Sequence, residues 1–323
     1  MQVRDRRTLE VPVSGFLENG QWRDGWYDTR ASHGEFLRTT SLFRNVVTED
    51  GASGFRAEAG RYRLYVSLAC PWAHRTLVAR KLKGLEDVVP VTVLEPVMSQ
   101  GWAFSDALPD PLHGFRYLHQ LYAAADPHYT GRVLVPMLWD QQTGTIVSNE
   151  SSEILRMFNE GFGALAKGDV DLYPAPLRAE IDRINAFVYD NINNGVYRCG
   201  FATEQAAYER AFDRLFSALD AVEARLAQQP WLVGGQPTEA DWRLFTTLVR
   251  FDAVYFGHFK CNRNRLEDFP QLSRYLRALY LVPGIADTVN IDHIKRHYYM
   301  SHPHINPTRI VPAGPRLKFC EPA

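Results

Sequence analysis

Residues 66–76 read VSLACPWAHRT, and this stretch indicates the fold of the first half of the chain. The segment RYRLYVS, from Arg61, alternates apolar and polar side chains, as expected of a strand. Pro71 suits the first position of a helix, and apolar residues recur at helical spacing up to Gly84, which suits a helix C-terminus. We therefore expect a strand that leads directly into a helix, with Cys70 at the helix N-cap.

The elements expected after this helix give the order of a thioredoxin-like domain. They are a buried strand at 88–94, a helix at 115–125, a hairpin made by 132–140 and 143–151, and a helix at 151–159. Beyond Tyr173 the pattern changes, and it predicts four helical segments at 176–192, 203–228, 238–256 and 269–282. The expected fold class is an α/β thioredoxin-like N-terminal domain plus an all-α C-terminal domain.

The chain length of 323 residues also favours two domains. We expect an N-terminal extension at 1–60, draped over the domain that follows, because its short extended pieces are joined by glycine-rich turns. The thioredoxin-like domain is expected at 61–166 and a linker at 167–176. The helical domain, with a C-terminal tail, is expected at 177–323.

Composition excludes several classes of function. The formal net charge is −1, so no basic field would attract nucleic acid. No apolar run is long enough for a membrane span, and the first residues lack the apolar core of a secretory signal. The four cysteines are widely spaced without a Cys-x-x-Cys pair, which argues against a disulfide framework or a four-cysteine zinc site. A reducing cytoplasm is the expected location.

The chemistry of the opening stretch centres on Cys70. At an N-cap its sulfur would face unpaired backbone N–H groups and the positive end of the helix dipole, which favour the reactive thiolate. A buried structural cysteine is the alternative interpretation. Three residues later stands Ala73, where a dithiol oxidoreductase would carry its second cysteine. A mixed disulfide at Cys70 must therefore be resolved by a thiol from solution, and glutathione is the abundant candidate.

Two further features suit glutathione. Pro136 precedes an expected strand, and in thioredoxin-like folds the equivalent proline is cis and lies opposite the active cysteine. Residues 149–151 open the next helix, whose N-terminus is a natural site for a peptide carboxylate. Glu150 could take the ammonium of a γ-glutamyl group. An ordinary helix cap without a ligand is the alternative for this segment.

Together these segments carry a family resemblance. SLACPWAHRT, VPMLWD, SNESSEILRMFN and TEADWRLF resemble the cysteine-type branch of the glutathione transferase superfamily. The CPWAHR string, residues 98–104 and the long extension are similar to the glutathionyl-hydroquinone reductases, or Xi-class glutathione transferases. The resemblance covers nearly the whole chain. It implies an oxidoreductase in which Cys70 takes the glutathionyl group from a glutathionyl-hydroquinone, and a second glutathione frees Cys70 as glutathione disulfide.

The resemblance also implies roles for particular residues. Tyr197 would be the proton donor and acceptor, and Tyr255 and Tyr298 would be the hydroxyls near the thiol, with Tyr299 as the rival of Tyr298. Glutathione, the co-substrate, would be bound by Trp102, Arg132, Val133, Leu134, Val135, Glu150 and Ser151. A cytoplasmic homodimer is implied. Read from chemistry alone, most of the fifteen tyrosines would be core or interface residues.

Three other readings stay open at this point. An omega-like thioltransferase or dehalogenating transferase would use the same Cys70 chemistry on another electrophile. A non-catalytic binding module would need no depressed thiol pKa, whereas either enzyme would. A metal site is suggested by His293, His297, His302 and His304, but no acidic partner stands at a motif spacing, so no metal is expected.

Overall fold

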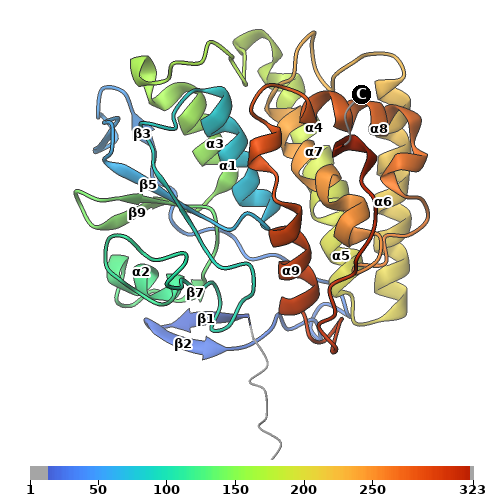
Figure 1. Ribbon diagram of the computed structural model, residues 1–323, viewed down its shortest axis with the longest axis horizontal. Coiled ribbons are helices and arrows are strands. Elements are labelled where there is room, and N and C mark those ends of the chain that lie inside the picture. Colours follow the sequence, from blue (N-terminus) through green and yellow to red (C-terminus); the bar gives the residue numbers. More distant parts are fainter. Residues whose placement is uncertain (1–13, 321–323) are drawn as a thin grey trace, which may run out of the picture.

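A computed structural model describes residues 14–320, and it contains both predicted domains (Figure 1). The four-stranded sheet has the order β6-β5-β8-β9, built from Val91–Val93, Tyr62–Val66, Met137–Asp140 and Thr145–Ser148. Strand β5 runs parallel to β6 and antiparallel to β8, which in turn is antiparallel to β9. This mixed sheet is the thioredoxin-like arrangement that the sequence predicts.

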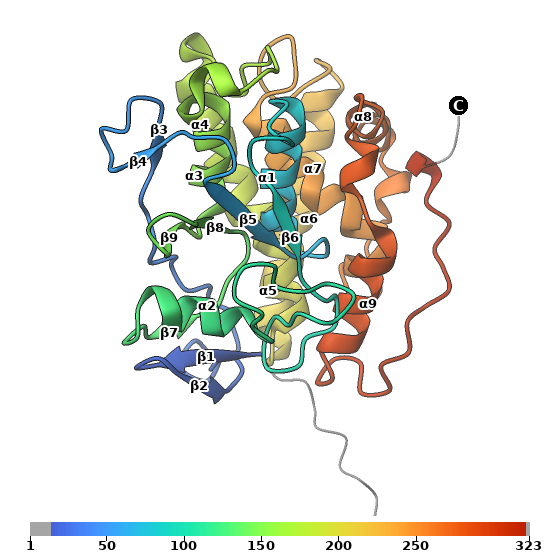
Figure 2. The ribbon, with the colours of Figure 1, turned by 60° about the vertical axis from the view of Figure 1, so that its left-hand side comes forward.

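The helices of the first domain include one, α1 (Pro71–Leu82), that packs against the second domain. Helix α1 contacts α3 (Ser151–Arg156) and, across the domain boundary, α7 (Glu239–Arg250) (Figure 2). Helix α2 (Leu118–Ala125) packs near β9 on the other side of the site. The two helix N-termini that the sequence singled out, those of α1 and α3, therefore lie close to the interdomain boundary.

The N-terminal extension pairs with the first domain through one short strand. Strands β1 (Gly15–Glu18) and β2 (Gln21–Asp24) form a hairpin, and β1 also pairs with β7 (Gly131–Arg132). Two further short strands, β3 (Val47–Thr48) and β4 (Phe55–Arg56), pair with each other in parallel. The segment between these two units runs past the N-terminus of α3, where it contributes to a cavity.

The second domain contains two helices more than the four predicted. Helices α4 (Arg178–Val188), α6 (Gln205–Leu226), α7 and α8 (Pro270–Tyr280) match the prediction, whereas α5 (Gly195–Phe201) and α9 (Ile291–Ser301) were not expected. Helix α5 is short and contains two glycines, and α9 is rich in charged and histidine residues, so neither shows a clear apolar face in the sequence. Both carry tyrosines into the site. The remaining short helical turns are Met157–Gly161, Gly163–Leu165, Ala175–Leu177, Tyr189–Asn193, Phe251–Tyr255, Leu266–Asp268, Ala286–Thr288 and Lys318–Cys320.

Helix α7 is the core of the second domain, because every one of its residues is buried. It starts with a capping box, in which the Thr238 N–H donates to the Asp241 carboxylate at 2.8 Å. It ends at Arg250, next to the start of α1. Helix α1 itself ends as predicted, with Gly84 in the left-handed conformation at φ 60°.

Candidate active site

Cys70 lies at the N-cap of α1, directly after the loop that leaves β5, as the sequence predicts. Its N–H donates to the Ser67 carbonyl oxygen at 3.0 Å, and its own carbonyl accepts the His74 N–H at 3.0 Å. Cys70 is 8% exposed, and its Sγ donates to the carbonyl oxygen of Val135 at 3.4 Å. The Val135–Pro136 peptide bond is cis, which confirms the prediction for Pro136. The thiol therefore faces this peptide across a narrow space.

The pKa of Cys70 differs from the expectation that capping lowers it. Burial raises the pKa of the Cys70 thiol, and the N–H groups of Ala73 and Trp72 and the charges of Arg250 and Arg38 offset this only in part. Cys70 stands at the N-cap but makes no side-chain capping hydrogen bond, and the removal of its sulfur from water outweighs the favourable groups around it. A depressed thiol pKa in the unliganded protein is therefore not the property that separates an enzyme from a binding module here.

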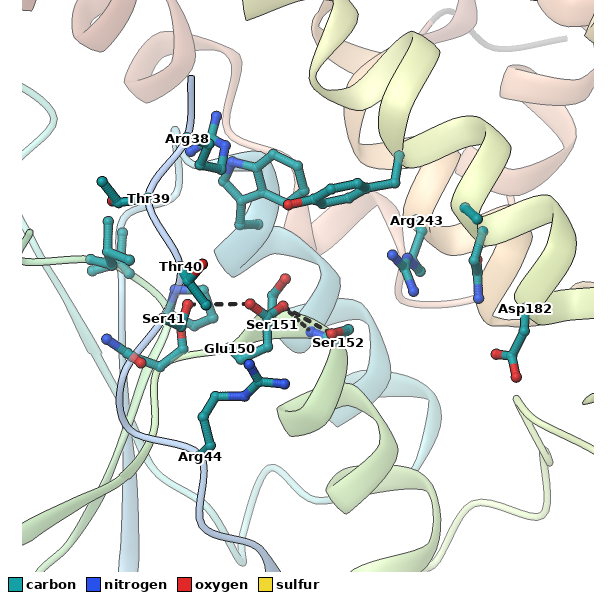
Figure 3. A pocket seen from close by; sticks show the side chains of 18 residues that line it. Arg38, Thr39, Thr40, Ser41, Arg44, Glu150, Ser151, Ser152, Asp182 and Arg243 are labelled. Atoms are coloured by element: carbon teal, nitrogen blue, oxygen red, sulfur yellow. Dashed lines mark hydrogen bonds between the residues drawn. The ribbon is translucent and has the colours of Figure 1, made fainter. Parts of the chain in front are cut away.

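A cavity of about 440 Å³ opens at the N-terminus of α3, between the extension and the helical domain (Figure 3). Glu150 and Ser151 line it from the first domain, Ser41 and Arg44 from the extension, and Arg243 from α7. Charged groups of both signs thus surround the cavity. This lining suits a zwitterionic peptide such as the γ-glutamyl end of glutathione.

Glu150 is held as a carboxylate inside this cavity. Its Oε1 accepts the N–H and the hydroxyl of Ser152 at 3.1 and 2.9 Å, and its Oε2 accepts the Ser41 hydroxyl at 3.2 Å. Burial opposes ionisation, but the bonds from Ser152, the charge of Arg75 and the Ser41 bond together lower the pKa of Glu150. Arg75 also donates to the hydroxyl of Ser151 at 3.5 Å. A negative charge is therefore fixed where an ammonium ligand could meet it.

A second cavity, of about 120 Å³, lies on the other side of Cys70. Cys70, Tyr197 and Tyr298 line it, together with the predicted glutathione-binding residues Trp102, Arg132, Val133, Leu134 and Val135. Arg38, Trp72, Leu134 and Val135 line both cavities. Cys70 therefore lies where a peptide-sized cavity adjoins an aromatic one.

The three predicted tyrosines meet at their hydroxyl groups. The hydroxyls of Tyr197 and Tyr298 share a hydrogen bond of 2.6 Å, and those of Tyr298 and Tyr255 share one of 3.0 Å. Tyr197 faces Cys70 closely enough that, after burial, a negative sulfur raises the pKa of its phenol. Tyr255 and Tyr298 bond to a tyrosine rather than to the sulfur. Tyr299 donates to a backbone carbonyl at 3.5 Å and does not line the cavity of Cys70.

Arg132 is the predicted binding residue whose side chain is already occupied. Its guanidinium donates to the carbonyl oxygens of Gly15, Gly25 and Trp26 at 3.1, 2.7 and 2.9 Å, so it holds the extension in place. The backbone of Arg132 is engaged as well, because it pairs with Phe16 of β1 and its carbonyl oxygen accepts the Tyr129 hydroxyl at 2.9 Å. Trp102, in contrast, stacks on His297 with 4.9 Å between the ring centroids, and its side chain lines the second cavity.

The sequence analysis did not find several residues that complete the site. The guanidinium of Arg38 lies 4.7 Å from the Trp72 ring and 4.9 Å from the Tyr197 ring, and it donates to Asn194 at 3.0 Å. Arg243 reaches the first cavity from α7. No period or motif marks either arginine, because each lies far in the sequence from the groups it contacts.

Of the four C-terminal histidines, His297 and His302 are buried, whereas His293 is half-buried and His304 is exposed. His258 and His302 share a hydrogen bond of 3.1 Å, and His297 bonds to the Pro96 carbonyl oxygen at 2.9 Å. Burial lowers the pKa of His258 to about 3 and that of His297 to about 4, so both are neutral at physiological pH. Within residues 14–320 no group of three or more His, Cys, Asp or Glu side chains is arranged to hold a metal ion.

Two cysteines that are isolated in the sequence are neighbours in the structure. Burial and then the Cys199 thiol raise the pKa of Cys261 well above its ordinary value. Both are buried and neither forms a disulfide, whereas Cys320 is exposed. In the same described part of the chain, no helix is both long and apolar enough to cross a bilayer.

The fold and the site define a glutathione transferase. Residues 69–160 match the family model for the glutathione S-transferase N-terminal domain, and residues 205–278 match that for the C-terminal domain. A Xi-class glutathione transferase structure from Natrialba magadii covers 96% of each chain at 48% identity, with a TM-score of 0.90. The glutathione-bound structure of YqjG from Escherichia coli covers 95% of this chain and 98% of its own at 50% identity, with a TM-score of 0.88.

Two relatives of known name indicate which class of glutathione transferase this is. Glutathionyl-hydroquinone reductase YqjG of Escherichia coli is 53% identical over 95% of this chain and 97% of its own. Glutathionyl-hydroquinone reductase PcpF of Sphingobium chlorophenolicum is 53% identical over 93% and 96%. The chain therefore belongs to the glutathionyl-hydroquinone reductase family, the Xi class of glutathione transferases.

Proposed function

We propose that this protein uses glutathione to reduce glutathionyl-hydroquinones to hydroquinones. The observation that carries the proposal is that Cys70 and Tyr197 line one small aromatic cavity, which adjoins the larger, charged cavity at Glu150. The proposed nucleophile, Cys70, and the proposed proton donor, Tyr197, thus line the same cavity, and this cavity adjoins one that is large enough for part of a peptide. The names of the two 53%-identical relatives support the same reaction.

The proposed reaction has two steps. The Cys70 thiolate attacks the sulfur of the conjugate, an S–S bond forms, and the bond between sulfur and the ring breaks. The ring carbon receives a proton from the Tyr197 hydroxyl, so the hydroquinone leaves as a neutral product. A second glutathione thiolate then attacks the mixed disulfide and releases glutathione disulfide and the Cys70 thiolate. As the second glutathione ionises, its thiol proton restores the Tyr197 hydroxyl. Overall, one glutathione thiol and the sulfur of the conjugate become glutathione disulfide, and the carbon–sulfur bond of the ring is replaced by a carbon–hydrogen bond.

We propose that the first cavity binds the γ-glutamyl end of glutathione. The ionised Glu150 would take the ammonium, while the hydroxyl of Ser151 and the first N–H groups of α3 would take the carboxylate. The backbone of Val135 would pair with the cysteinyl unit, and Trp102 would cover it. Binding there would displace the bond from Cys70 to the Val135 carbonyl, and so remove one partner of the neutral thiol.

We further propose a homodimer in a reducing cytoplasm. The buried cysteines Cys70, Cys199 and Cys261, none of which forms a disulfide, support the reducing compartment. Light scattering of the purified full chain tests the first point: a mass of one chain at micromolar concentration would contradict it. Localisation of a tagged full-length protein by fractionation tests the second.

The function itself is tested by incubating the protein with a glutathionyl-hydroquinone and glutathione. We expect Cys70→Ser to abolish release of the hydroquinone, because no mixed disulfide can form. Tyr197→Phe should slow ring release by roughly 10²- to 10⁴-fold, the range for loss of an acid catalyst, while simple disulfide exchange persists. Tyr299→Phe is the matched control, because it removes a buried hydroxyl outside the cavity.

Two results would contradict the assignments. If the wild type exchanges simple disulfides but leaves the conjugate intact, the omega-like thioltransferase is the better description. Equal loss of both activities in Tyr197→Phe would contradict the role of Tyr197 as proton donor. After treatment with glutathione disulfide, mass spectrometry should find the glutathionyl adduct on Cys70 and not on Cys320.

A further inference from the structure

Arg250, the last residue of α7, reaches from the helical domain into the loop that carries the nucleophile. It is completely buried. Its Nε donates to the Ala69 carbonyl oxygen at 2.9 Å, and one terminal nitrogen donates to the Leu68 carbonyl oxygen at 3.0 Å. The two carbonyls belong to the residues just before Cys70. Since α7 lies against α1 (Figure 2), this side chain ties the start of α1 to the second domain.

The other partners of Arg250 are neutral as well. Its second terminal nitrogen donates to the Thr246 carbonyl oxygen at 2.7 Å and to Nδ1 of His74 at 2.9 Å. Burial and then the charge of Arg250 lower the pKa of His74, which remains uncharged, and its Nε2 bonds to the Thr288 hydroxyl at 2.8 Å. No carboxylate of the described residues forms an ion pair with Arg250.

A buried guanidinium without an anionic partner is expensive, because its charge has left water and no opposite charge compensates it. The group that can supply the missing negative charge is the sulfur of Cys70, which becomes an anion during the proposed reaction. The hydrogen bonds to Leu68 and Ala69 place the guanidinium on the loop that ends at this sulfur.

We propose that Arg250 is the positioning residue of the nucleophile: it fixes the loop before Cys70 and holds a permanent positive charge beside the sulfur. The proposal rests on the proposed function only in taking Cys70 as the nucleophile. A guanidinium serves this purpose better than an ammonium, because its fork of donors can bind several carbonyls and stays protonated when buried.

The charges around the sulfur are consistent with this role. Besides Arg250, the titratable groups that line the cavity of Cys70 are Arg38 from the extension, Tyr197 on α5, and Tyr298 and His297 on α9, while His74 on α1 contacts Arg250. The two histidines are neutral and the two phenols are protonated at neutral pH. Arg250 and Arg38 remain as cations, and both lower the pKa of Cys70, Arg250 the more strongly. Arg38 is half-exposed, so water screens its charge.

The test uses the full chain with Arg250→Gln and Arg250→Lys. Alkylation of Cys70 by iodoacetamide is followed against pH, with the Cys70 peptide quantified by mass spectrometry. We expect Arg250→Gln to raise the pH of half-maximal alkylation by about one unit, a tenfold loss of thiolate at a fixed pH below the midpoint. Arg250→Lys keeps the charge and should keep the midpoint, but its turnover should fall because it cannot hold both carbonyls.

Arg80→Gln is the matched control for the loss of a carbonyl-bound guanidinium. Arg80 donates to the carbonyl oxygens of Val89 and Glu86 at 2.6 and 2.8 Å, near the far end of α1, and its loss should leave the midpoint unchanged. In Arg250→Gln, kcat should fall about tenfold while the KM for glutathione stays constant, because Arg250 does not line the first cavity.

The proposal is overturned if Arg250→Gln and the wild type share one midpoint, or if the Gln and Lys variants shift equally. If circular dichroism shows that Arg250→Gln is unfolded, the Arg250→Lys variant still tests the proposal. A rise of one full pH unit in its midpoint of Cys70 alkylation, despite the retained charge, would overturn the proposal. Alkylation needs neither glutathione nor a conjugate. A wild type that fails to reduce the conjugate would therefore contradict the proposed function and leave this inference standing.

Discussion

Replacing Tyr298 by phenylalanine tests the hydroxyl chain at the centre of the site. Tyr298 is the middle member, because its hydroxyl bonds to Tyr197 at 2.6 Å and to Tyr255 at 3.0 Å. Its side chain is buried, so no water replaces the oxygen that is removed. The change therefore breaks two hydrogen bonds, and the buried phenols of Tyr197 and Tyr255 each lose the bond to Tyr298.

The expected cost follows from these two bonds. Each is worth about 1 kcal/mol net, so the free energy of unfolding should fall by about 2 kcal/mol. The Tyr197 and Tyr255 hydroxyls already influence each other's pKa, and they can turn toward each other in the variant, which limits further loss. Tyr255→Phe is the matched control, because it removes one bond and should cost about 1 kcal/mol.

Chemical denaturation measures the two costs, and the rate of hydroquinone release measures the effect on the reaction. Tyr298→Phe should slow ring release roughly tenfold, equivalent to about 1.4 kcal/mol, because the Tyr197 hydroxyl loses the bond that orients it. Binding of the γ-glutamyl end of glutathione should change less than ring release, since Tyr298 does not line the first cavity. If Tyr298→Phe costs no more stability than Tyr255→Phe and releases the ring at the wild-type rate, the reasoning about this chain is wrong.

Three further changes probe the cavity, the fold and the support of α5. Glu150→Gln should raise the KM for glutathione by roughly tenfold in initial-rate assays, because a charge-assisted bond to the ammonium is lost; an unchanged KM would refute this contact. Burial opposes ionisation of Asp140, but the hydrogen bonds from Arg61 at 3.0 and 2.7 Å help to lower the pKa of its carboxyl group. The ionised Asp140 therefore stabilises the fold fully above the ordinary pKa of a carboxyl group, and this stabilisation is lost as pH falls through the lowered pKa. Asp140→Asn should therefore cost about 3 kcal/mol at pH 7 in urea unfolding and flatten the decline of stability below about pH 4; an equally steep decline would contradict the pairing. Gly200→Ala would place a Cβ 2.2 Å from the buried Phe259 ring, so the free energy of unfolding should fall by about 1–3 kcal/mol. The rate of ring release should fall more than the affinity for glutathione. An unchanged thermal unfolding temperature would contradict this close approach.

Much of the site could be predicted because its residues are neighbours in the sequence. Cys70 at the N-cap, Pro71 at the first helical position and Gly84 at the helix end are local features, and so is the helix start at Glu150. Capping and turn chemistry act over a few residues, and a single sequence shows them directly. The resemblance added Tyr197, Tyr255 and Tyr298, which no local pattern distinguishes from other tyrosines.

The remainder depends on which distant groups the fold brings together. The cations at Arg38 and Arg250 lie 32 residues before and 180 residues after Cys70 in the sequence, yet both act on its sulfur. The sequence determined by itself where the thiol sits on its helix and that no second cysteine follows it. Only the tertiary structure decided how deeply the thiol is buried, which raises its pKa, and which charges oppose that effect. The reason is that helix capping is a short-range property of the backbone, whereas desolvation and electrostatic interaction add up over everything packed around an atom.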